Sequence, residues 1–384
     1  MGKQEFEELL FQAFCWLHQH PELGFEEYET TKHIKEILRE HGIRILDLPM
    51  KTGLVAEIGG GEPTIALRAD IDALPVTEET ELPYRSLASG RMHACGHDFH
   101  TTTMLGAAIL LKERETELPG TVRMIFQPAE EVSGGARAVL DTGVLRDVRF
   151  ICGLHVLPSL PVGTLGLKAG AASASVDRFW IRIIGKGSHA AHPDDGTDPI
   201  VAAACLISAA QTIVSRNVDP ASANLISFTH VEGGNTWNVI PSEVFLEGTI
   251  RSLSKTDRAF LKRRLSEMTD SIGKAYGTRT EMDWYEGPPP TDNDSEWIAA
   301  AAALAKERGF TVTVPHTTLI GEDFAFYQEE LTGVFAFVGT GLGPSIHSPK
   351  FQADPKAIAP ASEYFAAMAE TALRRIVEQG VLIK

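Results

Sequence analysis

The sequence predicts an α/β protein of two domains, in which a compact βαββαβ domain is inserted into a larger domain built on a sheet with parallel strand pairs. Its 384 residues exceed the ~250–300 residues at which a single hydrophobic core stops growing. Hydrophobic residues make up 43% of the chain, which fills more than one core and excludes a disordered protein. Strands alternate with helices toward both ends of the chain, and a different order of elements lies between them.

The N-terminal part alternates helices and apolar strands. Apolar residues at three- and four-residue steps from Phe6 to Leu17 predict an amphipathic helix, and a second helix runs from about Thr30 to Glu40. A third helical pattern spans Thr101 to Leu111. The expected strands are Leu54–Ile58, Thr64–Ala69, Val122–Phe126 and Phe150–Leu154. These strands are apolar on both faces, which indicates parallel pairs in a sheet that collects ligands at the carboxyl ends of its strands.

The middle of the chain follows the ferredoxin-like order of strand, helix, strand, strand, helix, strand. Its expected elements are Val176–Ile184, Asp198–Arg216, Leu225–Val231, Glu243–Arg251, Thr256–Tyr276 and Thr280–Tyr285. A Gly- and Pro-rich linker follows at 287–292, before the last elements, Trp297–Arg308, Val334–Val338 and Ala361–Val377. We therefore expect a discontinuous first domain at 1–175 and 287–384, with the second domain at 176–286.

Charge and composition exclude several classes of function. The chain carries 35 basic and 51 acidic residues, a formal net charge of −16, which disfavours nucleic acid and anionic membrane surfaces. No apolar run approaches the ~20 residues that cross a bilayer. The N-terminus, MGKQEFEELL, is acidic where a signal peptide needs a cationic start, and four scattered Cys do not form a disulfide framework. We expect a cytoplasmic protein.

The densest polar cluster is the segment Met92–His100. If this segment is extended, Cys95 and His97 face the same side and converge on one point. A thiolate and an imidazole are good ligands for divalent metals. The alternative is that Cys95 is a buried apolar residue and the histidines cap or solvate a loop.

Three other segments supply possible ligands. Glu130 and Glu131 follow an expected strand, so one can ligate a metal while the other acts as a general base; a solvated acidic loop is the alternative. His155 ends the next expected strand, where a satisfied core histidine is equally common. His347 lies in a tight loop far along the chain.

Together these segments offer five ligands, which are too many for a closed tetrahedral site and suit a pair of metal ions about 3.5–4 Å apart. That arrangement predicts hydrolytic chemistry without a redox cofactor. Asp70 and Asp72 also follow a strand, and either could orient a ligating His. Turn formation before Pro75 is the alternative for both aspartates.

These residues resemble those of the M20 metallopeptidases, in the amidohydrolase branch that includes aminoacylase, hippurate hydrolase and auxin-conjugate hydrolase. The similarity covers essentially the whole chain. The matching motifs are HPELGFEE (His20–Glu27), RADIDALP (Arg68–Pro75), MHACGHDFHT (Met92–Thr101), FQPAEE (Phe126–Glu131), GLH (Gly153–His155), GKGSHAAHP (Gly185–Pro193), NVIP (Asn238–Pro241), GTIRSL (Gly248–Leu253) and GEDFAFY (Gly321–Tyr327).

The resemblance implies a mixed-sheet catalytic domain of the zinc-exopeptidase type with two divalent metal ions, Glu130 as the general base and Asp72 as a supporting residue. Cys95 resembles the bridging ligand that is an aspartate in many relatives. Asp70 stands where the family usually has a ligating His, and His97 takes over that ligand. The implied metal ligands are Cys95, His97, Glu131, His155 and His347. The metal is open among zinc, manganese, cobalt and nickel.

For the inserted domain, the resemblance implies a lid and a dimerisation surface, and so a homodimer or higher homo-oligomer. His189 matches a lid His that polarises the scissile carbonyl, and His192 is a nearby competitor for that role. Asn238 matches a polar residue of the lid. Arg251 resembles an Arg that pairs with a substrate carboxylate, although an ordinary strand-end salt bridge is the alternative.

The leading hypothesis is a metal-dependent amidohydrolase that cleaves the amide bond of N-acyl-L-amino acids into a carboxylate and a free amino acid. Acetyl, benzoyl and indole-acetyl groups all remain open as the acyl part. An exopeptidase with the same two metals is the alternative. The other candidates are a non-catalytic metal-binding or assembly protein and a hydrolase with Cys95 as nucleophile.

Overall fold

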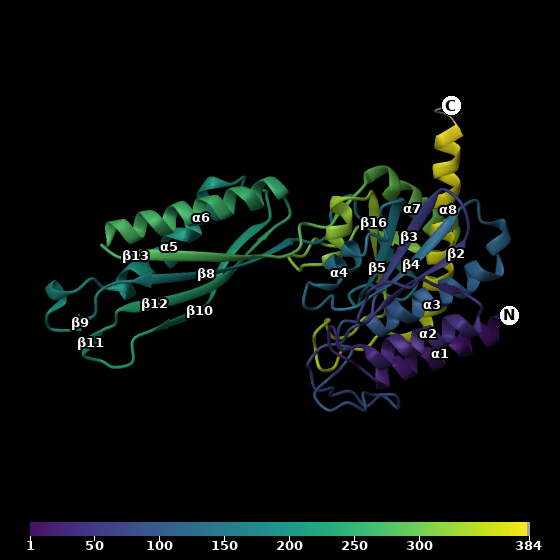
Figure 1. Ribbon diagram of the computed structural model, residues 1–384, viewed down its shortest axis with the longest axis horizontal. Helices are drawn as coiled ribbons and strands as arrows, with labels where there is room; N and C mark the ends of the chain where they lie inside the picture. The colour runs from purple at the N-terminus through teal and green to yellow at the C-terminus, as the bar shows by residue number, and fades with distance from the viewer. Residues whose placement is uncertain (382–384) are drawn as a thin grey trace. The chain divides into compact units, whose positions relative to one another are not determined.

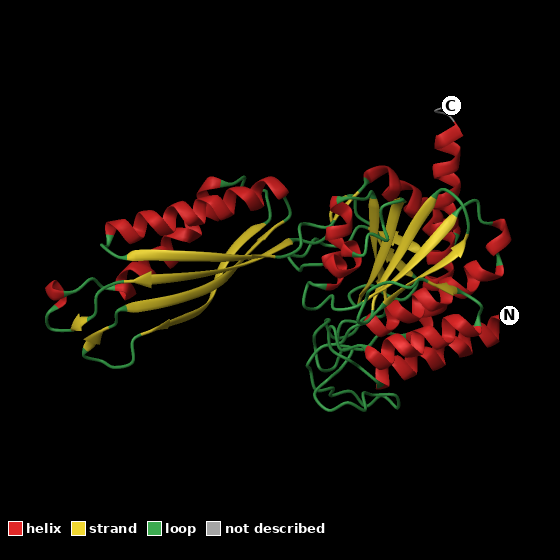
Figure 2. Ribbon diagram, in the orientation of Figure 1, coloured by secondary structure: helices red, strands yellow, loops and turns green. Residues whose placement is uncertain are grey.

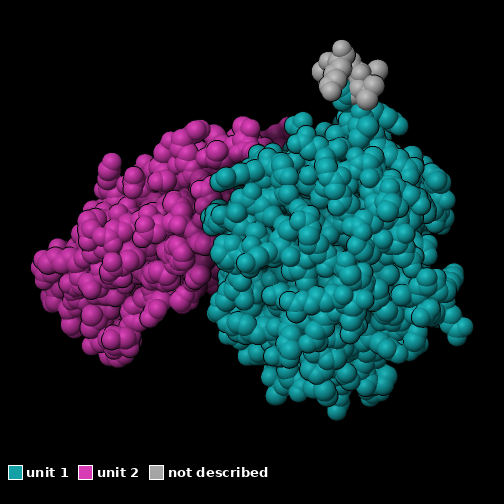
Figure 3. Space-filling model, turned by 45° about the vertical axis from the view of Figure 1, so that its right-hand side comes forward, with its two compact units in different colours: residues 1–170, 292–316, 323–384 teal, residues 171–291, 317–322 magenta. Residues whose placement is uncertain are grey.

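The computed structural model describes residues 1–381 and divides the chain into two compact units, shown in separate colours in Figure 3. Unit 1 comprises 1–170, 292–316 and 323–384, and unit 2 comprises 171–291 and 317–322. The expected boundaries at 176 and 286 lie inside unit 2, because the flanking segments hydrogen-bond there. Ala172 N donates to Thr291 O at 2.8 Å, and Ala174 N donates to Ile320 O at 2.8 Å.

Unit 1 is built on a mixed sheet of eight strands, drawn in yellow in Figure 2. In spatial order its strands are β1 (Arg44–Ile45), β2 (Leu54–Gly59), β4 (Thr121–Gln127), β3 (Thr64–Asp70), β5 (Val148–Leu157), β16 (Gly333–Gly339), β6 (Thr164–Gly166) and β15 (Thr311–Thr313). The central neighbours β4, β3, β5 and β16 run parallel, while β1, β2 and β6 pair antiparallel with their neighbours β2, β4 and β16. The α/β class with parallel pairs is confirmed.

Helices cover this sheet. They are α1 (Lys3–Gln19), α2 (Tyr28–Glu40), α3 (His97–Glu113), α4 (Gly135–Asp141), α7 (Ser295–Glu307) and α8 (Ile358–Val381), with short 3₁₀ turns at η1 (Glu115–Glu117), η3 (Asp323–Glu329) and η4 (Pro355–Ala357). Helices α3 and α8 pack against each other and against β3 and β5, and α1 and α2 pack on α3 (Figure 1). Helix α3 is buried along almost its whole length, as expected for an element between a sheet and other helices.

Unit 2 has the predicted βαββαβ order. Its antiparallel sheet has the strand order β10 (Asn224–Gly233), β12 (Glu243–Ser252), β8 (Ser175–Ile184) and β13 (Arg279–Glu286), with α5 (Pro199–Asn217) and α6 (Lys255–Ala275) packed on it. In β8 and β12, buried residues alternate with half-buried or exposed ones, which fits a sheet with one face on a core. A small ribbon pairs β9 (Ser188–His189) with β11 (Val239–Ile240), and η2 (Pro193–Asp195) follows β9. The two-residue strands β7 (Gly170–Ala171) and β14 (Asp292–Asn293) pair with each other.

Helix α5 is long and apolar enough to cross a membrane, judged by length and composition alone. Its buried residues, among them Leu206 and Ile213, belong to the hydrophobic core of unit 2, and Ser208 and Gln211 interrupt its apolar run. A core helix passes the same criterion, so α5 is weak evidence for a membrane span.

Candidate metal centre

Segments from four parts of unit 1 meet beyond the carboxyl ends of the central strands. The loop after β3 carries Asp72, the loop after β4 carries Glu130 and Glu131, and β5 carries His155. The His347 loop is tied to the same place, because His347 N donates to Ala94 O at 2.7 Å. The carboxyl edge of a parallel sheet is where such residues are expected to gather.

Cys95 is common to two groups of metal-ligating side chains. Its Sγ lies 3.4 Å from His155 Nε2, and the donor atoms of Cys95, His97 and His155 all lie within 4.8 Å of one another. The donor atoms of Cys95, Glu131 and His347 form a second group by the same measure. A sulfur that stands in two donor groups is placed where two metal ions could share it.

Two donor atoms in this cluster are left without hydrogen bonds. His97 Nε2 and Glu131 Oε1 are buried and have no hydrogen-bond partner within the described part of the chain. They lie 3.9 Å apart, and His347 Nε2 lies 3.5 Å from the same Glu131 oxygen. Buried polar atoms are costly without partners, and a cation held among sulfur, nitrogen and oxygen donors satisfies them. The residues present therefore fit a metal centre.

The local structure around His97 differs from the expectation. Cys95 and His97 do not lie on one extended segment, because Gly96 adopts φ = 83° and His97 is the first residue of α3. The left-handed conformation, which glycine adopts at little cost, turns the chain between the two residues. They converge through this bend, and not through the i, i+2 alternation of a strand.

Asp72 orients both His97 and the glutamate loop. His97 Nδ1 lies 3.1 Å from Asp72 Oδ1, and Glu131 N donates to Asp72 Oδ2 at 3.0 Å. The contact between His97 Nδ1 and Asp72 fixes the His97 ring so that its Nε2 faces the other donor atoms.

Asp70 supports a different histidine. His100 Nδ1 lies 2.6 Å from Asp70 Oδ1, and Val156 N donates to His100 Nε2 at 2.9 Å. Both ring nitrogens of His100 are thereby occupied, so His100 holds the strand beside His155 and does not offer a ligand atom. Sequence reasoning missed His100, although it stands in the same His-rich segment.

A buried network behind the site was also missed. Arg68 is fully buried and donates to Asp70 and to Asp323, at 2.6 Å in each case, and to Gln127 Oε1 at 2.8 Å. Gln127 Nε2 and Ala136 N donate to the Asp323 carboxylate. The GEDFAFY motif was the available signal for Asp323, but its link to Arg68 spans the chain and cannot be read from spacing.

Glu130 lies on the turn that follows β4. Its main-chain oxygen accepts from Ser133 N at 2.7 Å, and its Oε1 accepts from Asp323 N at 3.4 Å. Ligating atoms of His97, Glu130 and Glu131 lie within 4.8 Å of one another. Glu130 is thus beside the donor groups but outside the two that share Cys95, which is the place for a proton acceptor.

His155 lies inside β5 and not at the strand's end, as had been expected, because the strand continues to Leu157. Its Nδ1 lies 2.8 Å from Val156 O, so Nδ1 carries the proton and donates. The other nitrogen, Nε2, is then unprotonated and faces the Cys95 sulfur, in the tautomer that ligation requires.

Burial and neighbouring charges set the protonation of the cluster. Burial raises the pKa of the Cys95 thiol well above its ordinary value, and the Glu131 carboxylate raises it further. Burial alone would raise the pKa of Glu131, but His347 and His97 outweigh this effect and hold it below its ordinary value. Burial opposes the imidazolium of His97, yet Asp70 and Asp72 raise its pKa. Cation binding must therefore displace protons from Cys95 and His97.

The remaining predicted residues lie in unit 2. His189 is exposed on β9. The next residue, Ala190, donates its main-chain N–H to Asn238 O at 3.0 Å, which brings Asn238 beside the His189 segment. The rings of His189 and His192 lie 5.8 Å apart. Arg251 lies on β12, half-buried, and burial lowers its pKa, opposed by Asp177. It has no ion-pair partner among residues 1–381, so the strand-end salt bridge is not observed.

Comparison with known proteins identifies the family. Residues 66–371 match the model of peptidase family M20/M25/M40. The chain belongs to this family. The resemblance drawn from the motifs is thereby confirmed, and this M20 chain is a hydrolase by membership.

Relatives of known activity match this M20 chain over most of its length. N-acetylcysteine deacetylase of Bacillus subtilis strain 168 is 47% identical, covering 98% of this chain and 100% of that protein. IAA-amino acid hydrolase ILR1-like 5 of Arabidopsis thaliana is 39% identical, covering 87% of this chain and 78% of that protein. The structure of the Bacillus subtilis YXEP protein, described as a dinuclear metal binding peptidase from the M20 family, matches with a TM-score of 0.88 and 44% identity, covering 97% of this chain and 99% of that one.

Proposed function

We propose that this M20 chain is a two-metal amidohydrolase that releases a free amino acid and a carboxylate from N-acyl-L-amino acids. The observation that carries the proposal is Cys95, which stands in two donor groups at once, with Glu130 beside them. A structural metal site has no use for a carboxylate that stands beside its ligands without being one of them, which speaks against a non-catalytic role. The similarity to a deacetylase and to an IAA-amino acid hydrolase supports an acyl amino acid as the substrate.

In this proposal the metal ligands are Cys95, His97, Glu131, His155 and His347. When bound, two divalent cations supply Lewis acidity and a nearby water of lowered pKa. Glu130 takes a proton from the attacking water and passes it to the nitrogen of the leaving amino acid. Asp72 holds His97 and the Glu131 main chain in place. Zinc, manganese, cobalt and nickel all suit this donor set.

Unit 2 supplies the groups that recognise the substrate. Arg251, half-buried and without an ion pair in the described residues, suits the carboxylate of the amino-acid part. His189 and Asn238 suit the carbonyl, whose oxygen gains charge as the amide is attacked. We assign the contact with the substrate carbonyl to His189. Substitution of His192, the nearby competitor for this role, serves as the comparison.

The sheet of unit 2 supports the proposal of a homodimer. Arg251 pairs with Val176 at one end of β8, and Glu243 pairs with Ile184 at the other end. These ends lie ~25–30 Å apart in a strand of this length, and His189 follows beyond Ile184. One copy of unit 2 therefore cannot bring Arg251 and His189 to the same small substrate. A second copy of the chain is proposed to provide His189 and Asn238.

The test is hydrolysis by protein reconstituted with each metal in turn, across a panel of N-acetyl, N-benzoyl and indole-acetyl amino acids and of dipeptides. We expect the highest kcat/KM on an N-acyl amino acid, loss of activity with a chelator and recovery with metal. Glu130→Ala is expected to keep its metal and lose nearly all turnover. Faster cleavage of dipeptides would favour the exopeptidase alternative, and activity that survives chelation would favour Cys95 as a nucleophile.

A further inference from the structure

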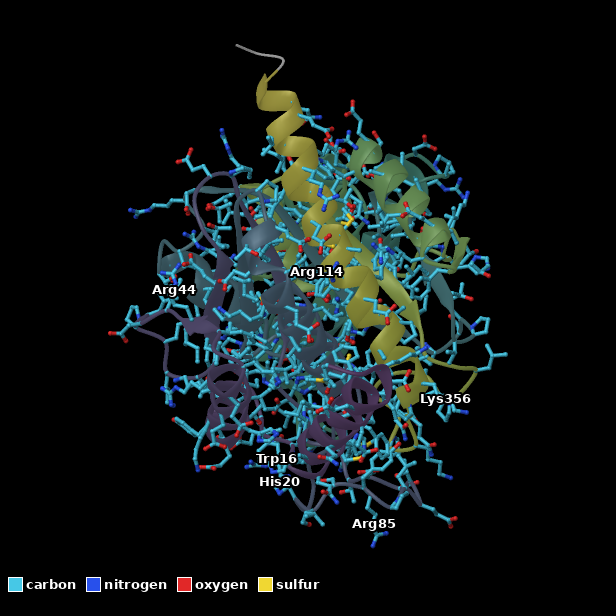
Figure 4. The ribbon with its side chains drawn as sticks, turned by 90° about the vertical axis from the view of Figure 1, so that its right-hand side faces the viewer. Trp16, His20, Arg44, Arg85, Arg114 and Lys356 are labelled. Atoms are coloured by element: carbon cyan, nitrogen blue, oxygen red, sulfur yellow. The ribbon has the colours of Figure 1, made fainter. Side chains whose placement is uncertain are left out.

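The motif His20–Glu27 has no part in the proposed chemistry, yet it lies beside the site. It begins where α1 ends: the His20 ring stacks on Trp16 at 4.4 Å between centroids, and the two are labelled in Figure 4. The chain then passes along the segment after Asp72, because Leu23 pairs with Ala73 and Ala73 N donates to Glu22 O at 2.8 Å. The motif therefore runs next to the residue that orients His97.

Glu27, the last residue of the motif, reaches the loop that carries the glutamates. Its side chain is fully buried, and its Oε1 accepts from Ala129 N at 2.8 Å. A carboxylate that is buried so completely is costly, and burial raises its pKa. Its contact is with the main chain of Ala129, so the bond acts on backbone conformation directly before Glu130.

The backbone at Ala129 needs such support. Ala129 has φ = 53°, in the left-handed region that costs a residue with a Cβ on the order of 1–3 kcal/mol. Gly24, in the same motif, leaves room for it, because a Cβ at Gly24 would stand 3.1 Å from Ala129 Cα. Within the motif, Glu27 thus accepts a hydrogen bond from the Ala129 amide, and Gly24 leaves space for the turn.

The conformation of Ala129 decides where the next two side chains point. Beyond it, Ala129 O accepts from Gly134 N and Gly135 N at 3.2 and 3.1 Å, and Glu131 N is held by Asp72. If Ala129 relaxed to an ordinary negative φ, the chain would turn Glu130 and Glu131 away from their present directions. The hydrogen bond from Ala129 N to Glu27 holds the turn at the end that faces the motif His20–Glu27.

We propose that Glu27 is a positioning residue for the reaction, which holds Ala129 in a left-handed conformation and thereby aims Glu130 at water and Glu131 at the metal. The expected effect of Glu27 on kcat rests on the proposed function. The expected effect of Glu27 on metal affinity acts through Glu131 and does not depend on which substrate the protein cleaves.

The test compares Glu27→Ala with wild type by kcat, KM and cobalt titration of the metal-free protein. At saturating metal, kcat falls about 10- to 100-fold, the size expected for loss of a buried acceptor, while KM changes less. Cobalt affinity falls in the same direction. Glu27→Gln, whose amide oxygen can still accept from Ala129 N, loses less than Glu27→Ala in both measurements.

Two further variants separate positioning from general damage to the fold. In the Ala129→Gly background, Glu27→Ala has a much smaller effect, because glycine adopts positive φ without the Cβ penalty. Glu22→Ala is the matched control: its carboxylate accepts from Thr30 N at 2.8 Å at the start of α2, so its loss affects stability and not kcat.

The inference is overturned if Glu27→Ala keeps the kcat and cobalt affinity of wild type. It is also overturned if Glu27→Ala lowers kcat and cobalt affinity by the same factor in the wild-type and Ala129→Gly backgrounds. If wild type turns over no member of the substrate panel, the proposed function fails, and the cobalt affinities of the same variants still decide the role of Glu27.

Discussion

Asp72 Oδ1 lies 3.1 Å from His97 Nδ1, while the other oxygen of the same carboxylate accepts from the main chain of Glu131. One buried side chain thus holds proposed ligands from two different segments. We expect Asp72→Ala to weaken metal affinity about 10- to 100-fold, the usual effect of removing a residue that orients a ligand. Metal titration followed by calorimetry measures it. Asp47→Ala, which removes an exposed carboxylate, is the control, and equal affinities for the two variants would contradict the expectation.

Because Cys95 belongs to two donor groups, we expect its loss to remove more metal than the loss of a residue that belongs to one group. Cys95 belongs to both donor groups, whereas His347 belongs to one. After dialysis, Cys95→Ala should lack both ions and His347→Ala should keep one, as measured by elemental analysis. Cys152→Ala removes another buried thiol, on β5, and should keep both ions. Equal metal loss in the Cys95 and His347 variants would argue against a bridging role.

A buried ion cluster at the end of α1 predicts a pH dependence of stability. Burial opposes the charged form of His18, but hydrogen bonds to Asp98 (2.6 Å) and Glu78 (3.3 Å) outweigh burial and raise its pKa to about 9. Because the pKa of His18 in the folded protein lies above the ordinary histidine value of 6.5, this contribution is complete below about pH 6.5 and is lost as pH rises through 9. Its size is on the order of 2–4 kcal/mol.

Urea unfolding of wild type and His18→Gln at pH 6.5 and 9.5 measures this contribution. The difference in unfolding free energy between the two proteins should shrink at the higher pH. His41→Gln is the control, since His41 follows α2 and its Nδ1 lies 2.9 Å from the main-chain oxygen of Ile37. A difference that stays constant with pH would show that His18 is not charged in the folded protein.

The guanidinium of Arg251, which has no ion-pair partner within the described part of the chain, predicts a selective effect on substrate binding. Arg251→Gln should raise KM for an N-acyl amino acid about 10- to 100-fold, the range of a charged hydrogen bond. The same acyl amino acid with its carboxylate converted to an amide should bind wild type and variant alike. Arg182→Gln, which removes an exposed Arg paired with Glu243 and Glu281, should leave KM unchanged. Equal losses on both substrates would assign Arg251 a structural role.

The sequence predicted features that depend on local pattern. Apolar runs located the central strands, and the βαββαβ order of unit 2 followed from alternating strands and helices. The three-residue strands β6 and β15 were missed, because so short a run carries no periodicity. Helix α3 was predicted to begin at Thr101, four residues late, because polar residues such as His97 and Asp98 carry no apolar signal for its first turn.

The contacts that support the site were beyond sequence reasoning for a physical reason. Arg68 meets Asp323, and Glu27 meets Ala129, across separations of 255 and 102 residues. Such pairs are fixed only when the sheet and its loops come together. The ligand types and the orienting role of Asp72 could be read from local chemistry, but the buried partners Arg68, Asp323 and Glu27 could not.

The place of β16 in the sheet has a consequence for biosynthesis. This strand lies between β5 and β6, although all of unit 2 is translated before it. At ~5–20 residues per second, the ribosome needs roughly 10–35 s to proceed from the end of β5 to β16. Throughout that time the nascent sheet has an open edge at β5, of the kind that invites wrong pairing. The cell must therefore protect a half-built sheet that already displays four of the five proposed metal ligands, until the His347 loop emerges and completes the set.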